Sequence, residues 1–351
     1  MDDPTIASWR LHNLGLAAMS YPSATAVVDG LVGIQAEQYA HAMWAVATRT
    51  DGVTAEEFSR QFNDGEILRT HVLRPTWHFV RPDDIRWLVE LTAPRINATL
   101  TQLQRAHDID AATLESSTDL IGSILSEKGQ LTRAALGERL RDAGFPDERM
   151  VVMMMMMFHA EASLVICSGP TEGSTQTYAL LEERAPGARR LDRDKAIAEL
   201  VLRYFMGHGP ATERDLAYWA TMTLTDVRAG LGAIGDQLDH FDHGGKTYWH
   251  GPPPPSPEWP PTPRGHLLIA LDEYHNGYQD SRSLLDLEGI VPGRTEKQHR
   301  DGSGRRADGG RHATHDPQGR GLLRGQPLSW SRHGRTLRSG EGSRAPGRLP
   351  G

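Results

Sequence analysis

Three stretches of the chain share one short pattern: Gly52-Val-Thr54-Ala-Glu-Glu-Phe58, Gly129-Gln-Leu-Thr132-Arg-Ala-Ala-Leu136 and Gly209-Pro-Ala-Thr212-Glu-Arg-Asp-Leu216. In each stretch a threonine stands where the side-chain oxygen of an N-cap residue would accept a free backbone N–H of a new helix. An apolar residue follows four positions later, one turn along the buried face. The pattern therefore predicts three helices that begin at these threonines.

The surroundings of the three stretches are also alike. An amphipathic segment precedes each one, at residues 34–47, 120–127 and 197–206, and a second apolar helix and a hairpin are expected after it. This order is typical of a winged helix-turn-helix, whose partner is duplex DNA. We expect a mainly α protein with small β-hairpins (α+β), built from tandem winged helix-turn-helix modules.

The hairpins that would form the wings can be recognised one by one. Residues 67–80 alternate apolar and polar side chains around a proline turn. Residues 162–168 and 176–181 flank a glycine-rich turn, and residues 237–243 and 246–249 flank Gly244-Gly245. The expected parts of the chain are winged helix 1 (8–92), connecting helices (93–114), winged helix 2 (115–186), winged helix 3 (193–252), a partial β-barrel segment (265–290) and a tail (291–351).

Composition favours a cytoplasmic protein without a membrane span. No apolar run reaches the ~18 residues that a span requires, and the start of the chain lacks the features of a signal peptide. The single cysteine, Cys167, lies in a predicted buried strand, which argues against disulfides and a cysteine-based metal site. His159 and Glu161 lack a third ligand at a suitable spacing, so we expect no metal. The methionine-rich run 150–158 predicts a core helix, with a peptide-binding surface as the alternative.

The tail differs from the rest of the chain. Residues 292–351 contain no Ile, Val, Phe, Tyr or Met, so they cannot bury enough apolar surface to offset the entropy cost of ordering. The tail is basic, whereas the rest of the chain has a formal net charge of about −15. We expect a disordered tail, which is either a nucleic-acid-binding extension or the product of a reading-frame shift near residue 291.

Four segments together resemble a known family. They are residues 30–38 (Gly-Leu-Val-Gly-Ile-Gln-Ala-Glu-Gln), the hairpin 69–78 (Arg-Thr-His-Val-Leu-Arg-Pro-Thr-Trp-His), the run from His159 to residue 180, and residues 271–278. They are similar to the tandem winged-helix DNA-binding proteins typified by the AlkZ-type DNA glycosylases, over residues 8–290. The resemblance implies three winged helices followed by a small β-barrel, which would begin at residues 265–287. It also implies a monomer that binds duplex DNA and needs no cofactor.

The resemblance points to two catalytic residues. The family signature, Gln-x-Gln or Gln-x-Asp, aligns with Gln35-Ala-Glu37, where Glu37 keeps a carboxylate but adds a methylene. Removal of a cationic N-alkylated purine needs a positioned water and negative charge near the sugar rather than a strong acid. Gln35 would hold the water, and Glu37 would accept its proton. Residues i and i+2 of a regular helix point about 200° apart, so the alternative is an ordinary helix start with exposed polar side chains.

The hairpin after this signature carries the expected DNA-binding residues: Arg69, Arg74, Thr76, Trp77 and His78. Arginines and small hydroxyl groups suit phosphate or minor-groove contacts. Because strand residues alternate, Arg74, Thr76 and His78 share one face, and Trp77 faces the other way as either core or a stacking surface. Further arginines in the first third of the chain favour a basic patch there. Two functions stay open: a glycosylase that hydrolyses the N-glycosidic bond of alkylated bases, and a non-catalytic DNA-binding protein or transcriptional regulator.

Overall fold

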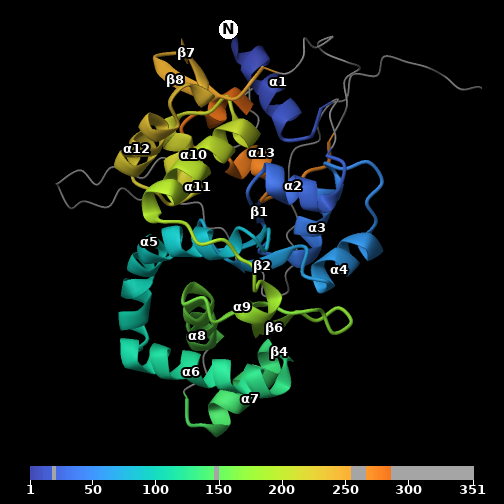
Figure 1. Ribbon diagram of the computed structural model, residues 1–351, viewed down its shortest axis with the longest axis vertical. Coiled ribbons are helices and arrows are strands. Elements are labelled where there is room, and N and C mark those ends of the chain that lie inside the picture. The colour runs from blue at the N-terminus through green and yellow to red at the C-terminus, as the bar shows by residue number, and fades with distance from the viewer. Residues whose placement is uncertain (18–20, 146–149, 254–265, 286–351) are drawn as a thin grey trace, which may run out of the picture. The chain divides into compact units, whose positions relative to one another are not determined.

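A computed structural model of the chain describes residues 1–17, 21–145, 150–253 and 266–285. Figure 1 shows these residues as a ribbon. The expectations for the tail 291–351, including its disorder and the shifted reading frame, lie outside the described residues. Among those described, no helix is both long and apolar enough to cross a bilayer.

One order of elements occurs twice in full, a helix, a short strand, two helices and a hairpin, and a third time with an isolated β-bridge in place of the short strand. The first repeat consists of α2 (Ala24–Gly30), β1 (Ile34–Gln35), α3 (Tyr39–Ala47), α4 (Ala55–Asn63), β2 (Leu68–His71) and β3 (Trp77–Val80). The second consists of α6 (Ala111–Lys128), β4 (Gln130–Thr132), α7 (Arg133–Asp142), α8 (Met150–Ala162), β5 (Ile166–Ser168) and β6 (Thr177–Leu180). The third consists of α10 (Arg193–His208), α11 (Glu213–Trp219), α12 (Leu224–Ile234), β7 (Asp239–His243) and β8 (Lys246–His250).

The remaining described elements lie before, between and after the repeats, except η1, which lies within the third repeat between α12 and β7. They are α1 (Asp3–Asn13), α5 (Ile85–Ala106), α9 (Leu181–Arg184), the short 3-10 helix η1 (Gly235–Gln237), α13 (Glu273–Asn276) and a second 3-10 helix, η2 (Arg282–Leu285). The protein is thus mainly helical with small antiparallel sheets, as expected.

The sheets of the repeats have a common topology. The strand order is β1-β3-β2 in the first repeat and β4-β6-β5 in the second, all antiparallel. In the third repeat β7 pairs with β8, and Ala211 makes an isolated antiparallel bridge with Trp249 where the other repeats have their short strand. The expected two-residue turn between β7 and β8 is confirmed, because Gly244 and Gly245 adopt φ of 57° and 75°.

The three threonines cap helices as predicted. Their side chains accept backbone N–H groups three residues ahead, and Thr212 forms a reciprocal capping box with Asp215. The position of the cap within the repeat differs, however. Thr132 and Thr212 begin the second helix of their repeats, whereas Thr54 begins the third, α4, so the hairpin follows directly. The further helix expected between residue 63 and the first hairpin is absent from this described stretch.

The structure also corrects the expectation of a helix over residues 34–47. Ile34 and Gln35 form β1 and pair with Phe79 and His78 of β3, and the helix α3 starts only at Tyr39. The N–H of Ala36 donates to the Trp77 carbonyl oxygen and that of Gln35 to Glu273 Oε1, so these groups bond to distant residues rather than along a helix. Tertiary pairing therefore overrides the helical periodicity of the segment.

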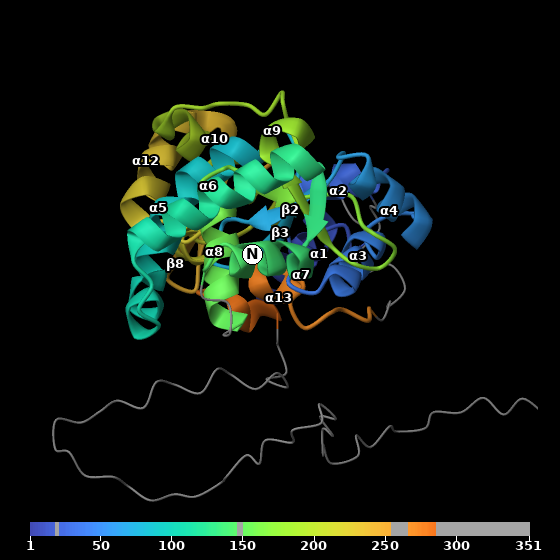
Figure 2. The ribbon, with the colours of Figure 1, turned by 90° about the horizontal axis from the view of Figure 1, so that it is seen from below.

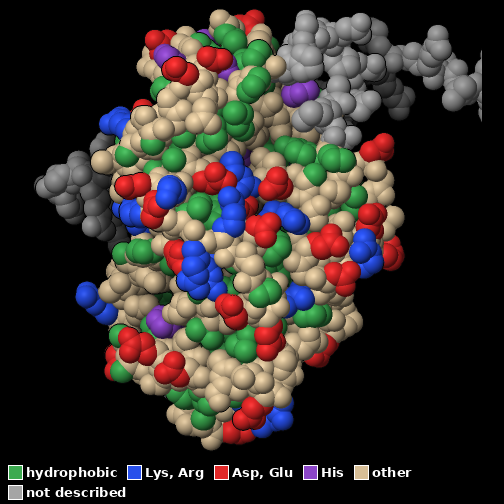
Figure 3. Space-filling view, viewed as in Figure 1, with side chains coloured by type: hydrophobic (Ala, Val, Ile, Leu, Met, Phe, Trp, Pro, Cys, Tyr) green, Lys and Arg blue, Asp and Glu red, His purple; other side chains and the backbone are tan. Residues whose placement is uncertain are grey.

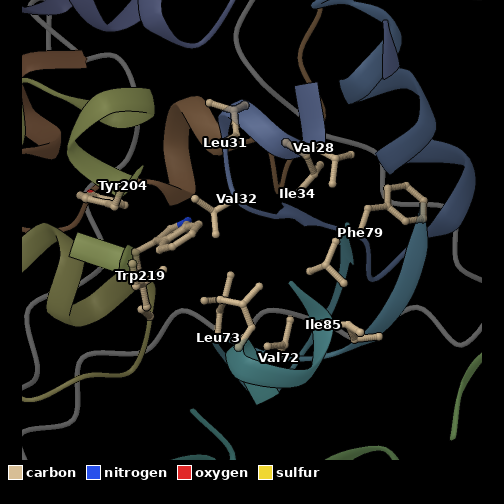
Figure 4. Packing of buried hydrophobic residues seen from close by; sticks show 14 of the residues in the cluster. Val28, Leu31, Val32, Ile34, Val72, Leu73, Phe79, Ile85, Tyr204 and Trp219 are labelled. Carbon is tan, nitrogen blue, oxygen red and sulfur yellow. The ribbon is translucent and has the colours of Figure 1, made fainter. Parts of the chain in front are cut away.

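The three repeats do not each have a separate hydrophobic core. The first and third repeats share a single cluster of buried residues, while the second has a cluster of its own. Figure 4 shows Trp219 of α11 beside Val32 and Leu73 of the first repeat. The methionine-rich helix α8 is a core helix as predicted, with Met155, Met156 and Met157 buried in the second cluster. The second repeat contacts the first along β2, which lies against α8 and β5 (Figure 2).

The described part of the predicted barrel segment, residues 266–285, contains α13 and η2 and no strand. It is held by side chains of the first and third repeats. Arg49 donates two hydrogen bonds to the buried Asp272, at 2.9 and 2.6 Å. Asp215 Oδ1 accepts the backbone N–H groups of residues 279, 280 and 281 at 2.7–3.1 Å. These buried, charge-assisted hydrogen bonds fix the segment on the two repeats.

Candidate functional site

Gln35 lies in a buried polar cluster that three parts of the chain build together. Its side-chain oxygen accepts hydrogen bonds from Arg74 Nη2 at 3.0 Å and from Asn276 Nδ2 at 3.1 Å. Its backbone N–H donates to Glu273 Oε1 at 3.1 Å. The amide of Gln35 is therefore fixed in orientation by donors from the hairpin of the first repeat and from α13.

Glu273 is the charged centre of this cluster. Its Oε2 accepts hydrogen bonds from Trp219 Nε1 at 2.7 Å and from His208 Nε2 at 3.4 Å, and Arg74 Nη2 lies 3.9 Å from its Oε1. Burial opposes ionisation of this carboxyl, but the His208 hydrogen bond and the Arg74 charge outweigh it and lower its pKa from 4.5 to about 2. Glu273 is thus a buried carboxylate that balances the charge of Arg74.

His78 is fully buried and neutral. Burial, followed by the nearby Arg74 charge, lowers its pKa from 6.5 to about 3. Its Nδ1 lies 3.0 Å from the Thr76 carbonyl oxygen, so this nitrogen carries the proton and donates. The other nitrogen, Nε2, faces Arg74 Nη2 at 3.4 Å as an acceptor. A neutral His78 positions Arg74 and contributes no positive charge to the site.

The hairpin arginines do not form the exposed basic surface that the sequence suggested. Only 8% of Arg74 and 9% of Arg69 is exposed, and both guanidinium groups donate to oxygens of the protein. Arg10 and Arg86, which were expected to extend the patch, are buried as well. Figure 3 shows the remaining Lys and Arg side chains of one face interspersed with Asp and Glu. Arg69 and Arg74 are buried because they donate hydrogen bonds to buried carbonyl and carboxylate oxygens, which would otherwise lack partners.

Glu37 is exposed, in contrast to Gln35. Its Oε2 accepts the backbone N–H of Trp77 at 3.4 Å, and its carbonyl oxygen accepts from Arg69 Nη2 at 3.2 Å. Gln35 is a strand residue, and the N–H of Ala36 continues the ladder to the Trp77 carbonyl at 2.6 Å. Glu37 lies in a bend after β1, so a regular helix does not set the relative direction of the Gln35 and Glu37 side chains.

Glu37 lies on a cavity of about 730 Å³ between the hairpin of the first repeat and the second repeat. This size falls in the range of small-molecule binding sites. The less exposed lining is formed by Arg69, Trp77, Met153, Gln176 and Tyr178. The exposed lining consists of Glu37, Arg133, Ala134, Glu138, Arg141, Met150 and Thr175. Gln35, Arg74 and His78 do not line this cavity and belong to the neighbouring polar cluster.

Trp77 is half-buried at the cavity and faces away from His78, as the strand alternation predicted. Its Nε1 donates to Glu161 Oε1 at 3.2 Å, and its ring lies 4.1 Å from that of His71 and 4.3 Å from the Arg69 guanidinium carbon. Glu161 comes from α8 of the second repeat and also accepts from the backbone and side chain of His71. Contacts from both repeats therefore fix the orientation of Trp77.

From the sequence, Glu161 is considered only as a metal ligand and interpreted as a structural polar group, and Glu273 and Asn276 have no predicted role. Each lies in, or two residues from, a segment that carries the family resemblance, and this was the only signal that pointed to them. Glu161 and Glu273 are acidic residues with 1% exposure, which is rare for an unpaired carboxylate and marks them as structural anchors. No group of three or more His, Cys, Asp or Glu side chains among the described residues is arranged to hold a metal ion.

Comparisons with known proteins agree with this architecture. A profile of the family described as DNA glycosylase AlkZ-like matches residues 28–340. The chain belongs to the AlkZ-like DNA glycosylase family. A relative, the interstrand DNA cross-link repair glycosylase of Streptomyces sahachiroi, is 26% identical over 254 residues, which are 69% of this chain and 67% of that protein. The structure of Streptomyces sahachiroi DNA glycosylase AlkZ matches with a TM-score of 0.59 at 24% identity, over 71% of this chain and 70% of that one.

This AlkZ-like chain therefore keeps two polar sites side by side. One is the buried cluster that orients Gln35, and the other is the cavity with Glu37 on its exposed lining. The backbone of β1 and the residues after it connect the two, because Gln35 and Glu37 are only two residues apart. Gln35 contributes an oriented amide to the buried cluster, and Glu37 contributes a carboxylate to the cavity.

Proposed function

We propose that this AlkZ-like protein is a DNA glycosylase that hydrolyses the N-glycosidic bond of an alkylated base in duplex DNA. Its three repeats act as winged helix-turn-helix modules on the duplex. The observation that supports this proposal most is the exposed Glu37 carboxylate at a cavity, two residues from a buried and oriented Gln35. The relative from Streptomyces sahachiroi, an interstrand DNA cross-link repair glycosylase, supports the same reaction class.

The chemistry follows from the charge of the leaving group. An N-alkylated base already carries a positive charge, so the pair of electrons of the broken C–N bond neutralises it without a general acid. The sugar becomes cationic in the transition state, and the Glu37 carboxylate stabilises that charge. A water molecule then forms the new C–O bond at the sugar, and its proton passes to Glu37.

Gln35 has a positioning role in this proposal. Because Arg74 and Asn276 occupy its side-chain oxygen, the amide nitrogen is the group left to orient the attacking water. Arg74 then acts through Gln35 and is not a phosphate ligand, since it is buried against Asn276 and Glu273. Thr76 and His78 likewise support the hairpin, and DNA contacts come from other, exposed side chains.

The test is single-turnover release of 7-methylguanine from a duplex. Glu37→Gln should slow release about a hundredfold or more, as expected when a positioned base is lost. Duplex binding should change little, because a carboxylate does not hold phosphate. The matched control is Glu56→Gln, which removes the same charge from an exposed position on α4 of the same repeat. Intact duplex binding without release above the spontaneous rate would instead identify a non-catalytic DNA-binding protein.

A further inference from the structure

The bend that carries Glu37 is not fixed by a helix cap. Residues 37 and 38 form this bend between β1 and α3. The side chain of Gln38, the N-cap of α3, makes no capping hydrogen bond within the described residues, whereas the three threonines each cap their helix. The Glu37 carboxylate accepts the Trp77 N–H at 3.4 Å, a long and therefore weak hydrogen bond. The direction of the Glu37 side chain thus depends on further contacts from outside the bend.

The side chain of Arg69 supplies these contacts. Its Nε donates to the Ala36 carbonyl oxygen at 2.8 Å, and its Nη2 donates to the Glu37 carbonyl oxygen at 3.2 Å. These two carbonyl groups belong to the two planar peptide units that meet at the Glu37 Cα atom. Because one rigid guanidinium group holds both peptide units, it also fixes the direction in which the Glu37 side chain leaves the backbone.

Arg69 is itself held by residues of two repeats. It pairs with Phe79 in the sheet of the first repeat, and its backbone N–H donates to Ser168 Oγ of β5 at 2.8 Å. Its guanidinium carbon lies 4.3 Å from the ring of Trp77, whose Nε1 donates to Glu161 of α8. Such support matters for catalysis, because a displacement of about 1 Å in a reacting group can slow a reaction about a hundredfold.

We propose that Arg69 is the positioning residue of Glu37 and holds its carboxylate at the cavity in the place from which it acts. This role rests on the proposed glycosylase function and adds to it the residue that orients the carboxylate. It replaces the phosphate contact that the sequence suggested for Arg69, since the guanidinium group is buried against carbonyl oxygens of the protein. Arg69 acts through Glu37, so it affects the rate of base release and not the affinity for the duplex.

The substitution Arg69→Lys tests this role. Lysine keeps the charge, but its compact ammonium group cannot replace two separate nitrogens of a planar fork. Single-turnover release of 7-methylguanine at saturating protein should slow about tenfold or more. The dissociation constant of the duplex should change less than about twofold, because no phosphate contact is removed. In the Glu37→Gln background Arg69→Lys should slow release no further, because the carboxylate that Arg69 orients is already absent.

The matched control is Arg184→Lys. Arg184 also donates to two successive carbonyl oxygens, those of Phe62 and Asn63, each at 2.8 Å, but it does not line the cavity. Both substitutions should lower the urea concentration at the midpoint of unfolding, and only Arg69→Lys should slow release. A weaker duplex affinity with a shallower salt dependence in Arg69→Lys would instead identify Arg69 as a phosphate ligand and overturn the positioning role.

Hydrogen exchange of the backbone amides does not depend on excision. Peptides that span residues 33–40 should exchange about tenfold faster in Arg69→Lys than in wild type, and Arg184→Lys should leave them unchanged. Equal exchange in wild type and Arg69→Lys, or a full loss of rate that persists in the Glu37→Gln background, would overturn the role of Arg69 and leave the glycosylase function standing. Faster exchange without excision by any of the proteins would support the hold of Arg69 on the bend and overturn the proposed reaction.

Discussion

The substitution Glu273→Gln tests whether the buried cluster depends on an ionised carboxylate. Both oxygens of Glu273 accept hydrogen bonds, Oε1 from the Gln35 N–H and Oε2 from Trp219 Nε1. A glutamine of the same size must turn its amide N–H₂ group toward one of these donors. Arg74 also loses the carboxylate that lies 3.9 Å from it. Removal of one partner of a buried ion pair costs about 3 kcal/mol of unfolding free energy or more.

The pH dependence of this cost follows from the pKa of Glu273, which falls from 4.5 to about 2 on folding. A lowered pKa gives stability that is fully present above pH 4.5 and is lost as the pH falls toward 2. The total is roughly 3 kcal/mol, at about 1.4 kcal/mol for each tenfold change in proton affinity. At pH 3.5 somewhat less than half of this stability is lost, so the gap in unfolding free energy between wild type and Glu273→Gln should narrow by about 1 kcal/mol.

Urea unfolding at pH 7, 5 and 3.5 measures this gap directly. The control is Glu182→Gln. The Glu182 side chain is 72% exposed and pairs with the buried Arg86, so its replacement should cost less than about 1 kcal/mol at every pH. If Glu273→Gln is no less stable than this control at pH 7, the buried cluster does not require the Glu273 carboxylate. The same conclusion follows if the gap to wild type is equal at pH 7 and pH 3.5, because the carboxylate would then not be the ionised group that the cluster requires.

Two further predictions concern packing and protonation. Gly230→Ala should destabilise the protein by about 1–3 kcal/mol in urea unfolding, because the new Cβ would lie 2.5 Å from Val201 Cγ2 of α10. Gly232 lies on the same helix, and a Cβ added there would meet open space, so Gly232→Ala should be neutral or stabilise by up to about 1 kcal/mol. Equal changes in unfolding free energy for the two substitutions would refute the close packing at Gly230. His78, whose pKa falls from 6.5 to about 3, should make stability decline as the pH drops below 6.5, by roughly 2 kcal/mol between pH 7 and 5. The unfolding free energy of His78→Asn should fall less between pH 7 and 5 than that of wild type. The same pH dependence in both proteins would contradict a buried neutral imidazole.

The local features of the fold were readable from the sequence. Thr54, Thr132 and Thr212 cap helices because an N-cap bond involves only residues three positions apart. The Gly244-Gly245 turn follows from the freedom of glycine to adopt positive φ. These interactions involve only residues that are close together in the chain, so the sequence pattern alone predicts them.

The functional site depended on contacts between distant residues. Gln35 forms a strand because β3, more than 40 residues later, offers a pairing edge. The residues that orient Gln35 include Asn276, and Trp77 is held by Glu161 of another repeat. No local periodicity encodes such pairs.

The sequence by itself determined the recurring capped helices and the hairpins. Only the tertiary structure decided which charges face the solvent. Arg69 and Arg74 look like DNA ligands in the sequence, yet they are buried because carbonyls and carboxylates from distant segments require their hydrogen bonds. The free energy of a charged side chain depends on the partners that surround it in space, and the order of residues along the chain does not specify those partners.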